Sequence, residues 1–182
     1  MSRPLALITG ASAGVGQSFA EQLAASGHDL IVVARRRDRL EALAQRLGAA
    51  HEAKVEVLVA DLTTDAGIDA VAARAAAASL DLVVNNAGIG GYRRFLELDP
   101  KVADALVAIH IRAVVQVTRA ALPGMVERKR GGVINVASLL AYSGSATAPF
   151  FPQRAVYAGA KAFLVTFTQA LATELADTGV RV

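Results

Sequence analysis

Short apolar segments alternate with longer amphipathic segments along the whole chain. The short segments are rich in aliphatic and β-branched residues, which is typical of strands buried on both faces. We expect these strands at Leu5–Thr9, Asp29–Ala34, Val55–Ala60, Leu82–Val84 and Gly131–Ala137. The longer segments carry apolar residues at helical spacing. We expect these helices at Gln17–Ser26, Leu40–Leu47, Ala66–Ser79, Lys101–Glu127 and Tyr157–Asp177.

Glycine and proline mark the expected helix ends. Gly27 and Gly48 directly follow the first two helices, where glycine is common as a C-terminal cap. Pro123 predicts a kink or a break near the end of the long fourth helix, because proline lacks the amide hydrogen that a helix needs.

This order of strand and helix, repeated five times, predicts an α/β fold. It implies a doubly wound parallel sheet with right-handed crossovers and helices on both faces, and so three layers. The length favours a single domain over residues 1–182. Ligands of such sheets bind beyond the carboxyl ends of the strands, where the strand order reverses.

Composition excludes several classes of protein and site. The chain has no cysteine, and its three histidines (His28, His51 and His110) lack the spacing of metal ligands, so no metal is expected. A net charge of +3 does not support a nucleic-acid partner. Charges interrupt the apolar stretch 102–126, and the N-terminus does not read as a signal peptide, so we expect no membrane span and a cytoplasmic protein.

A glycine-rich turn follows the first strand and is the first candidate binding site. Gly10, Gly14 and Gly16 permit a tight turn into a helix, whose first amide groups then point at one spot that suits a pyrophosphate. The alternative is an ordinary strand-to-helix turn. The residues expected at the phosphates are Gly10, Ser12, Ala13, Gly14, Val15 and Gly16.

Tyr157 and Lys161 form the second candidate site. Four residues apart on a helix, they share one face, and a cation beside a phenol lowers the phenol's pKa toward the range useful for proton transfer. Ser138, after the fifth strand, could hydrogen-bond a substrate oxygen. The alternatives are a core tyrosine beside a surface lysine, and a serine that caps a turn.

Taken together, these motifs resemble the short-chain dehydrogenase/reductase family, in its single-domain branch. The matching segments follow the family's order over nearly the whole chain: Thr9–Gly16, Asp61-Leu62, Asn85–Gly88, Ser138 and Tyr157–Lys161. The resemblance implies a Rossmann-type fold and NAD(P)-linked interconversion of a small alcohol and a carbonyl compound.

The resemblance also implies roles for individual residues. Tyr157 would exchange the proton with the substrate oxygen. Lys161 would lower the pKa of Tyr157 and hold the nicotinamide ribose, and Ser138 would orient the carbonyl group. The residues expected around the remainder of the cofactor are Asp61 and Leu62 at the adenine, and Asn86, Ala87 and Gly88 along the crevice.

The end of the second strand favours NADP(H) over NAD(H). An acidic residue there would accept a hydrogen bond from the ribose 2′-hydroxyl group, whereas arginine suits a 2′-phosphate. The chain has Ala34 followed by Arg35 and Arg36. The alternative is that these arginines only solvate the start of a helix.

Three features depart from the family pattern. His110 stands where the family has a catalytic asparagine, which would weaken or reroute the proton relay; the alternative is a tolerated helix residue. The interval from Ser138 to Tyr157 is long and contains Pro149 and Pro152, which predicts a loop beside the substrate. The chain ends at residues 179–182, where relatives begin a sixth strand, so we expect a fold truncated after the fifth helix, without the segment that covers substrate. The fifth strand would then have an unpaired edge.

Three functions therefore stay open. The first is an NADP(H)-dependent oxidoreductase with Ser138, Tyr157, Lys161 and His110 in its catalytic centre. The second is a catalytically impaired nucleotide-binding protein or fragment, and the third is an epimerase or dehydratase, which the glycine spacing disfavours. The long fourth and fifth helices predict a homodimer or homotetramer by resemblance. The substrate and the direction of the reaction are not readable from the sequence.

Overall fold

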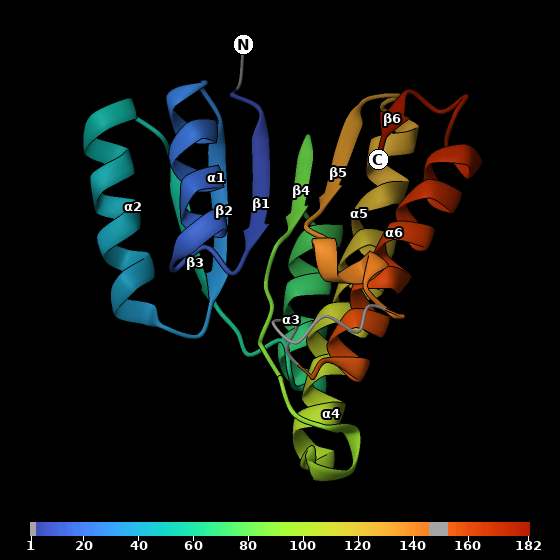
Figure 1. The fold of residues 1–182 in the computed structure, drawn as a ribbon. Coiled ribbons are helices and arrows are strands. Elements are labelled where there is room, and N and C mark those ends of the chain that lie inside the picture. The colour runs from blue at the N-terminus through green and yellow to red at the C-terminus, as the bar shows by residue number, and fades with distance from the viewer. Residues whose placement is uncertain (1–2, 146–152) are drawn as a thin grey trace.

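The protein is a parallel sheet covered by helices on both faces (Figure 1). A computed structural model describes residues 3–145 and 153–182. All strand pairs are parallel, in the order β3-β2-β1-β4-β5-β6. The strands are β1 (Leu5–Thr9), β2 (Asp29–Ala34), β3 (Val55–Val59), β4 (Leu82–Asn85), β5 (Gly131–Asn135) and β6 (Val180–Arg181). The order reverses between β1 and β4, as a doubly wound fold requires.

The helices connect successive strands. They are α1 (Gly14–Ala25), α2 (Arg37–His51), α3 (Asp65–Ala76), α4 (Pro100–Val107), α5 (Ala113–Glu127) and α6 (Ala155–Glu174). Three shorter elements complete them: the 3₁₀ turns η1 (Phe95–Glu97) and η3 (Leu139–Tyr142), and the π turn η2 (Ala108–Arg112).

Alternating side chains of the strands build two hydrophobic cores. On β1, Leu7 packs with residues of α3 and α5, such as Val71 and Val117, on one face of the sheet. Its neighbour Ile8 packs with α1 and α2, for example against Leu43, on the other face. The two-residue period of a strand thus assigns these helices to opposite faces, as the doubly wound prediction required.

A sixth strand corrects one expectation. Val180 and Arg181 pair with Gly131 and Gly132, so β5 does not have the wholly unpaired edge that we predicted. Gly179 makes this possible, because its φ is +79° and an added Cβ would collide with the backbone carbonyl of Lys129.

The helix-end predictions had mixed outcomes. Gly27 has a φ of +89° directly after the cap of α1, as predicted for a C-terminal glycine. The prediction for Gly48 was wrong, since α2 continues to His51. Glu52 takes the left-handed conformation instead, and its amide bonds the Gly48 carbonyl oxygen at 3.0 Å.

The long fourth helix is continuous but irregular. It runs from Pro100 to Glu127, and its irregularity is the π turn at residues 108–112 rather than the predicted break at Pro123, which lies within α5. By length and composition alone, this helix and α6 could cross a membrane, which for one or two helices is weak evidence of a span. Half of the Pro100–Glu127 window is buried in the fold, a feature shared with core helices of water-soluble proteins.

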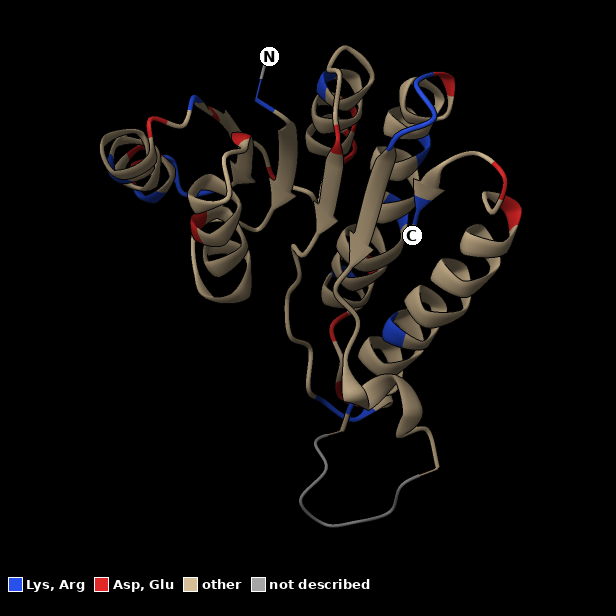
Figure 2. Ribbon diagram, turned by 90° about the horizontal axis from the view of Figure 1, so that it is seen from above, with Lys and Arg blue, Asp and Glu red and all other residues tan. Residues whose placement is uncertain are grey.

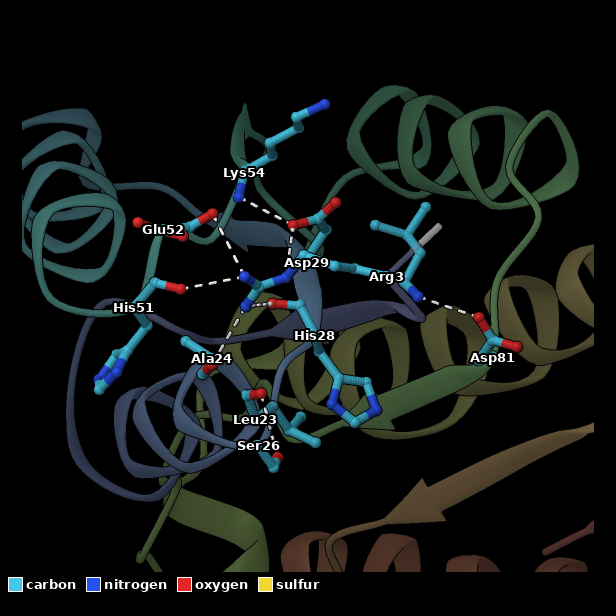
Figure 3. Close-up of polar contacts among 11 residues, drawn as sticks. Arg3, Leu23, Ala24, Ser26, His28, Asp29, His51, Glu52, Lys54 and Asp81 are labelled. Carbon is cyan, nitrogen blue, oxygen red and sulfur yellow. Dashed lines mark hydrogen bonds and ion pairs between the residues drawn. The ribbon is translucent and has the colours of Figure 1, made fainter. Parts of the chain in front are cut away.

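Arg3 joins the ends of three elements at the edge of the sheet opposite the strand carboxyl ends (Figure 3). Its guanidinium donates to the carbonyl oxygens of His51 at the end of α2 (3.0 Å) and Ala24 near the end of α1 (3.4 Å). Its Nε forms an ion pair with Asp29 Oδ1 at 3.3 Å, at the start of β2. One side chain therefore ties the C-terminal ends of two helices to the start of β2.

We expect Arg3→Lys to lower the free energy of unfolding by about 1–3 kcal/mol, because a single ammonium group cannot reach all these carbonyl groups. Chemical denaturation measures the loss. Arg37→Lys is the matched control, since the side-chain partner of Arg37 among the described residues is Glu41, in an exposed ion pair, and we expect a change under about 0.5 kcal/mol. Equal stability of the two variants would contradict this role of Arg3.

Candidate active site

The turn between β1 and α1 is shaped by its glycines. Gly10 and Gly14 have φ of +72° and +57°, values that favour glycine. Gly16 is helical, but an added Cβ would lie 2.5 Å from the Gly10 carbonyl oxygen. Ala13 caps α1 without a side-chain hydrogen bond, so the first amide groups of α1 keep their hydrogen-bonding capacity for an anion.

Thr9 and Asn86 connect this turn to the end of β4. The hydroxyl of Thr9 accepts hydrogen bonds from the amides of Asn86 and Ala87, each at 3.0 Å. Asn86 Nδ2 donates in return to the Thr9 carbonyl oxygen at 2.9 Å. Its amide group fills the space that a Cβ on Gly10 or Gly16 would need. The two strand ends are thereby fixed at the point where the strand order reverses.

A cavity of about 350 Å³ opens at this edge of the sheet. Its lining brings together most of the predicted cofactor-binding residues: Gly10, Ser12, Ala13, Val15, Arg35, Arg36, Asp61, Leu62, Asn86, Ala87 and Gly88. Four of the residues predicted to contact the cofactor do not line the cavity. They are Gly14 and Gly16, which shape the turn, and the pair Tyr157 and Lys161. A glycine cradle, a free helix start and two arginines suit a phosphorylated dinucleotide.

The charged side chains of the cavity are held in place. Arg36 donates to the Ser12 hydroxyl at 2.8 Å, and Arg35 lies 3.8 Å from Asp61. Burial alone would raise the pKa of Asp61, but hydrogen bonds from Thr63 and the charge of Arg35 outweigh it, so the pKa is lowered. Arg35 and Arg36 thus line the cavity together with the ionised carboxylate of Asp61.

Ser138, Tyr157 and Lys161 converge beyond the end of β5. Ser138 caps η3, accepting from the Leu140 amide at 3.2 Å, and it lies close enough to Tyr157 to lower the pKa of that phenol. The contact of this serine that has hydrogen-bond geometry is therefore the cap, and its role as a site residue stays a prediction. Lys161 Nζ lies 5.9 Å from the centre of the Tyr157 ring. Tyrosine and lysine share one face of α6, as their spacing predicted.

The electrostatics of this group differ from our expectation. The pKa of Tyr157 is raised, mainly by burial and further by Tyr92, rather than lowered by the lysine. Lys161 is buried and donates at 2.6 Å to the Val136 carbonyl oxygen, and burial lowers its own pKa to about 8. Desolvation is the largest cause for both groups, and it favours the neutral form of each.

His110 lies beside Tyr157, although it comes from the π turn η2. The two rings meet edge to face with their centres 5.3 Å apart. His110 Nε2 is 2.9 Å from the Ile89 carbonyl oxygen, a distance that fits donation by the Nε2–H tautomer. Nδ1 is buried and has no hydrogen-bond partner in the described residues. Burial lowers the pKa of His110 to about 4, so the ring is neutral at physiological pH.

The predicted loop between Tyr142 and Arg154 is only partly described. Its first residue, Tyr142, belongs to η3. Arg154, just before α6, donates to the Ser143 hydroxyl at 2.6 Å and joins the two ends of the segment. Pro149 and Pro152 lie outside the described residues.

Sequence reasoning missed two residues of this region. Thr9 is the last residue of an apolar strand, and its polarity there was the available signal. The Tyr92 ring lies tilted against that of Tyr157, with ring centres 5.4 Å apart at 59°, and a Gly-Gly pair before an aromatic residue was the available signal. In the described ranges, no group of three or more His, Cys, Asp or Glu residues could hold a metal ion.

Comparison with known proteins places this geometry in a family. A model of short chain dehydrogenases matches residues 4–182. An uncharacterized oxidoreductase of Myxococcus xanthus is 39% identical over 184 residues, covering 100% of this chain and 70% of that protein. It is one of many oxidoreductases that the chain resembles.

Solved structures agree with the sequence matches. A bulky-bulky ketone specific alcohol dehydrogenase from Comamonas testosteroni superposes with a TM-score of 0.91 at 31% identity, covering 99% of this chain and 70% of its own. A short-chain dehydrogenase from Sphingobium yanoikuyae in complex with NADPH gives 0.90 at 35% identity, covering 97% and 67%. The chain thus spans about two thirds of the length of these structures.

The burial of His110 predicts a loss of stability in mild acid. Its folded pKa of about 4 lies below the ordinary value of 6.5, so the unfolded chain binds the proton first as the pH falls. We expect the free energy of unfolding to fall between pH 6.5 and 4, by up to about 3 kcal/mol.

Denaturation at several pH values measures this slope. His110→Asn removes the titrating ring, and the slope should flatten whatever the absolute stability of the variant. His51→Asn, at the partly exposed end of α2, is the matched control and should keep the wild-type slope. An unchanged slope in His110→Asn would mean that another group titrates.

Proposed function

The chain belongs to the short-chain dehydrogenase/reductase family, and from that premise we propose that it is an NADP(H)-dependent oxidoreductase of a secondary alcohol and its ketone, or of an aldehyde. One observation carries the proposal: Ser138, Tyr157 and Lys161 converge at the same edge of the sheet as the glycine turn. Titratable groups of shifted pKa beside a nucleotide-sized cavity favour proton transfer there.

The residues of the chain supply the proton chemistry. When bound, the nicotinamide supplies or takes up the hydride. In the reducing direction, the Tyr157 hydroxyl gives its proton to the carbonyl oxygen, and the Ser138 hydroxyl holds that oxygen by a hydrogen bond. The raised pKa of Tyr157 keeps the phenol protonated at neutral pH, which is the form that reduction needs. His110, neutral at that pH, holds the Ile89 carbonyl beside Tyr157.

The preference for NADP(H) rests on the end of β2. Arg36 presents its guanidinium to the cavity while bonded to Ser12, and Ala34 offers no carboxylate to a ribose hydroxyl. Guanidinium groups bind phosphate through two parallel hydrogen bonds. Several solved relatives hold NADPH or NADP, including the Sphingobium yanoikuyae dehydrogenase.

Assembly and location are further proposals. Figure 2 shows α6 as an almost uncharged helix, whose charged residues are Lys161 and Glu174. Phe163 and Phe167 stack on it at 5.5 Å and are only partly buried, which suits pairing with a second copy. On the long fourth helix, the apolar face that contains Leu106, Ile109, Val114 and Val117 could serve either such an interface or the core, and all four residues are buried in this single chain. A cytoplasmic location and the division of 1–182 as one domain stay predictions.

We expect Tyr157→Phe to abolish most carbonyl reduction, with kcat falling at least about 100-fold, because the proton donor is gone. Oxidation of NADPH with a panel of ketones measures this, and calorimetry should show unchanged NADPH binding. Tyr142→Phe, which alters an exposed tyrosine, is the matched control. A folded wild-type chain that binds NADPH but turns over none of the ketones would instead favour a nucleotide-binding protein.

We expect Arg36→Ala to weaken NADPH binding by about 10- to 100-fold and to leave NADH binding nearly unchanged, because the lost contact is the charge-assisted pairing of the guanidinium with the 2′-phosphate. Calorimetric titration with both nucleotides measures the ratio. Arg39→Ala, an exposed arginine on the first turn of α2, is the matched control. Equal losses of affinity for both nucleotides would mean that Arg36 acts by holding the glycine turn through Ser12, rather than by binding the 2′-phosphate.

A further inference from the structure

The segment that follows β4 lines two cavities in succession. Residues 88–89 line the cavity at the glycine turn. Residues 90–92 line a second cavity of about 410 Å³, which lies where α4 begins. The ring of Tyr92 lies 5.4 Å from the ring of Tyr157, the residue proposed to transfer the proton. The second cavity therefore adjoins the reacting end of the proposed site.

Two glycines direct Tyr92 to this position. A Cβ on Gly91 would lie 2.5 Å from Leu106 Cδ1, so glycine lets the chain lie close to α4. A Cβ on Gly90 would lie 3.1 Å from the Tyr92 ring, so the ring packs closely over its own backbone. Tyr92 is nevertheless 44% exposed. One part of its ring thus contacts Tyr157, and another part is free to contact a ligand.

Further apolar side chains lie beside the reacting groups. Leu139 is the first residue after the serine proposed to hold the substrate oxygen. It is 90% exposed, a value that Leu96 alone exceeds among the large hydrophobic side chains of the described residues. Leu98 and Val102 line the second cavity together with Tyr92. Apolar surface that is exposed beside a cavity is typical of a ligand-binding site.

The charges of the second cavity disfavour an anionic ligand. Its lining contains two carboxylates, those of Glu97 and Asp99, and one guanidinium, that of Arg93. Arg93 already donates to the Tyr92 carbonyl oxygen at 3.3 Å, and Asp99 caps α4 by accepting from the Lys101 amide at 2.9 Å. The excess of negative charge would repel a carboxylate or a phosphate on a substrate.

We propose that the substrate is a neutral ketone with an aromatic substituent, and that this substituent packs against Tyr92 and extends into the second cavity. The inference rests on the proposed function, which places the carbonyl group at Ser138 and Tyr157. Leu139 supplies apolar surface beside that carbonyl group. Aromatic rings stabilise one another beyond simple burial, so the free part of the Tyr92 ring favours an aryl group over an alkyl chain.

Binding of ketones in the presence of NADP⁺, which cannot reduce them, tests the proposal without turnover. The two probes are para-methylacetophenone, which is neutral, and para-acetylbenzoate, which has a similar shape and carries a carboxylate. Saturation-transfer NMR titrations measure both affinities. We expect the full chain to bind para-methylacetophenone at least about 10-fold more tightly. Equal affinities, tighter binding of para-acetylbenzoate or no binding of either probe would overturn the proposal.

Two variants locate the bound ring. Tyr92→Ser removes the aromatic surface and should weaken binding of para-methylacetophenone by about 10-fold, whereas butanone, which has no ring, should lose less than about twofold. Leu139→Asn keeps the shape of an exposed side chain and should weaken binding of para-methylacetophenone by about threefold or more.

Val126→Asn is the matched control, because Val126 is exposed on the last turn of α5, at the opposite edge of the sheet, and we expect no change in either affinity. Unchanged binding of para-methylacetophenone in Tyr92→Ser would overturn the proposal, and so would an equal loss in Val126→Asn. If Tyr92→Ser does not fold, Leu139→Asn decides in its place, and unchanged binding in that variant overturns the proposal.

Turnover separates this inference from the proposed function. Selective binding of para-methylacetophenone without reduction of any ketone by NADPH would keep the aryl site and reject the oxidoreductase. Reduction of ketones with the same kcat/KM for para-methylacetophenone in the wild type and in Tyr92→Ser would keep the oxidoreductase and reject the aryl site.

Discussion

The hydrogen bonds between Thr9 and Asn86 are the constraint on which the site depends. They join the carboxyl ends of β1 and β4, the two strands between which the sheet changes direction. At such a point the connections leave on opposite faces of the sheet, and a crevice opens between them. Asn86 occupies the room left by two glycines, so the glycine turn packs directly against the end of β4. The first amide groups of α1 suit phosphate, because they are already oriented when the anion arrives.

Burial sets the electrostatic character of the chemical half of the site. Two basic side chains, His110 and Lys161, are almost fully buried, and burial shifts both toward their neutral forms. Each hydrogen-bonds one backbone carbonyl group, that of Ile89 after β4 and that of Val136 after β5. These two side chains therefore also fix the segments that follow the two strands. Burial thus shifts the pKa values of His110 and Lys161, while their hydrogen bonds position the backbone around Tyr157.

A second polar network couples the strands to the helices that bear these groups. Asn85 and Asn135 lie opposite each other on β4 and β5 and share a hydrogen bond of 2.9 Å. Asn85 also donates to Thr118 on α5, and Asn135 donates to Thr168 on α6. Because a buried amide is costly to leave unpaired, this chain of bonds fixes α5 and α6 against the sheet. The spacing of Tyr157 from the crevice follows from that packing.

The sequence by itself determined the fold class, the family and the residues of the crevice. Apolar runs, glycine positions and the Tyr157-Lys161 spacing are local features of the chain. They can be recognised without knowing which distant residues come into contact. Only the tertiary structure decided the charge states around Tyr157, since the burial of Lys161 and the approach of Tyr92 come from elements far apart in the chain. The tertiary structure also determined that α2 continues beyond Gly48 and that β6 pairs with β5. The end of a helix and the formation of a two-residue strand depend on contacts with residues distant in the sequence.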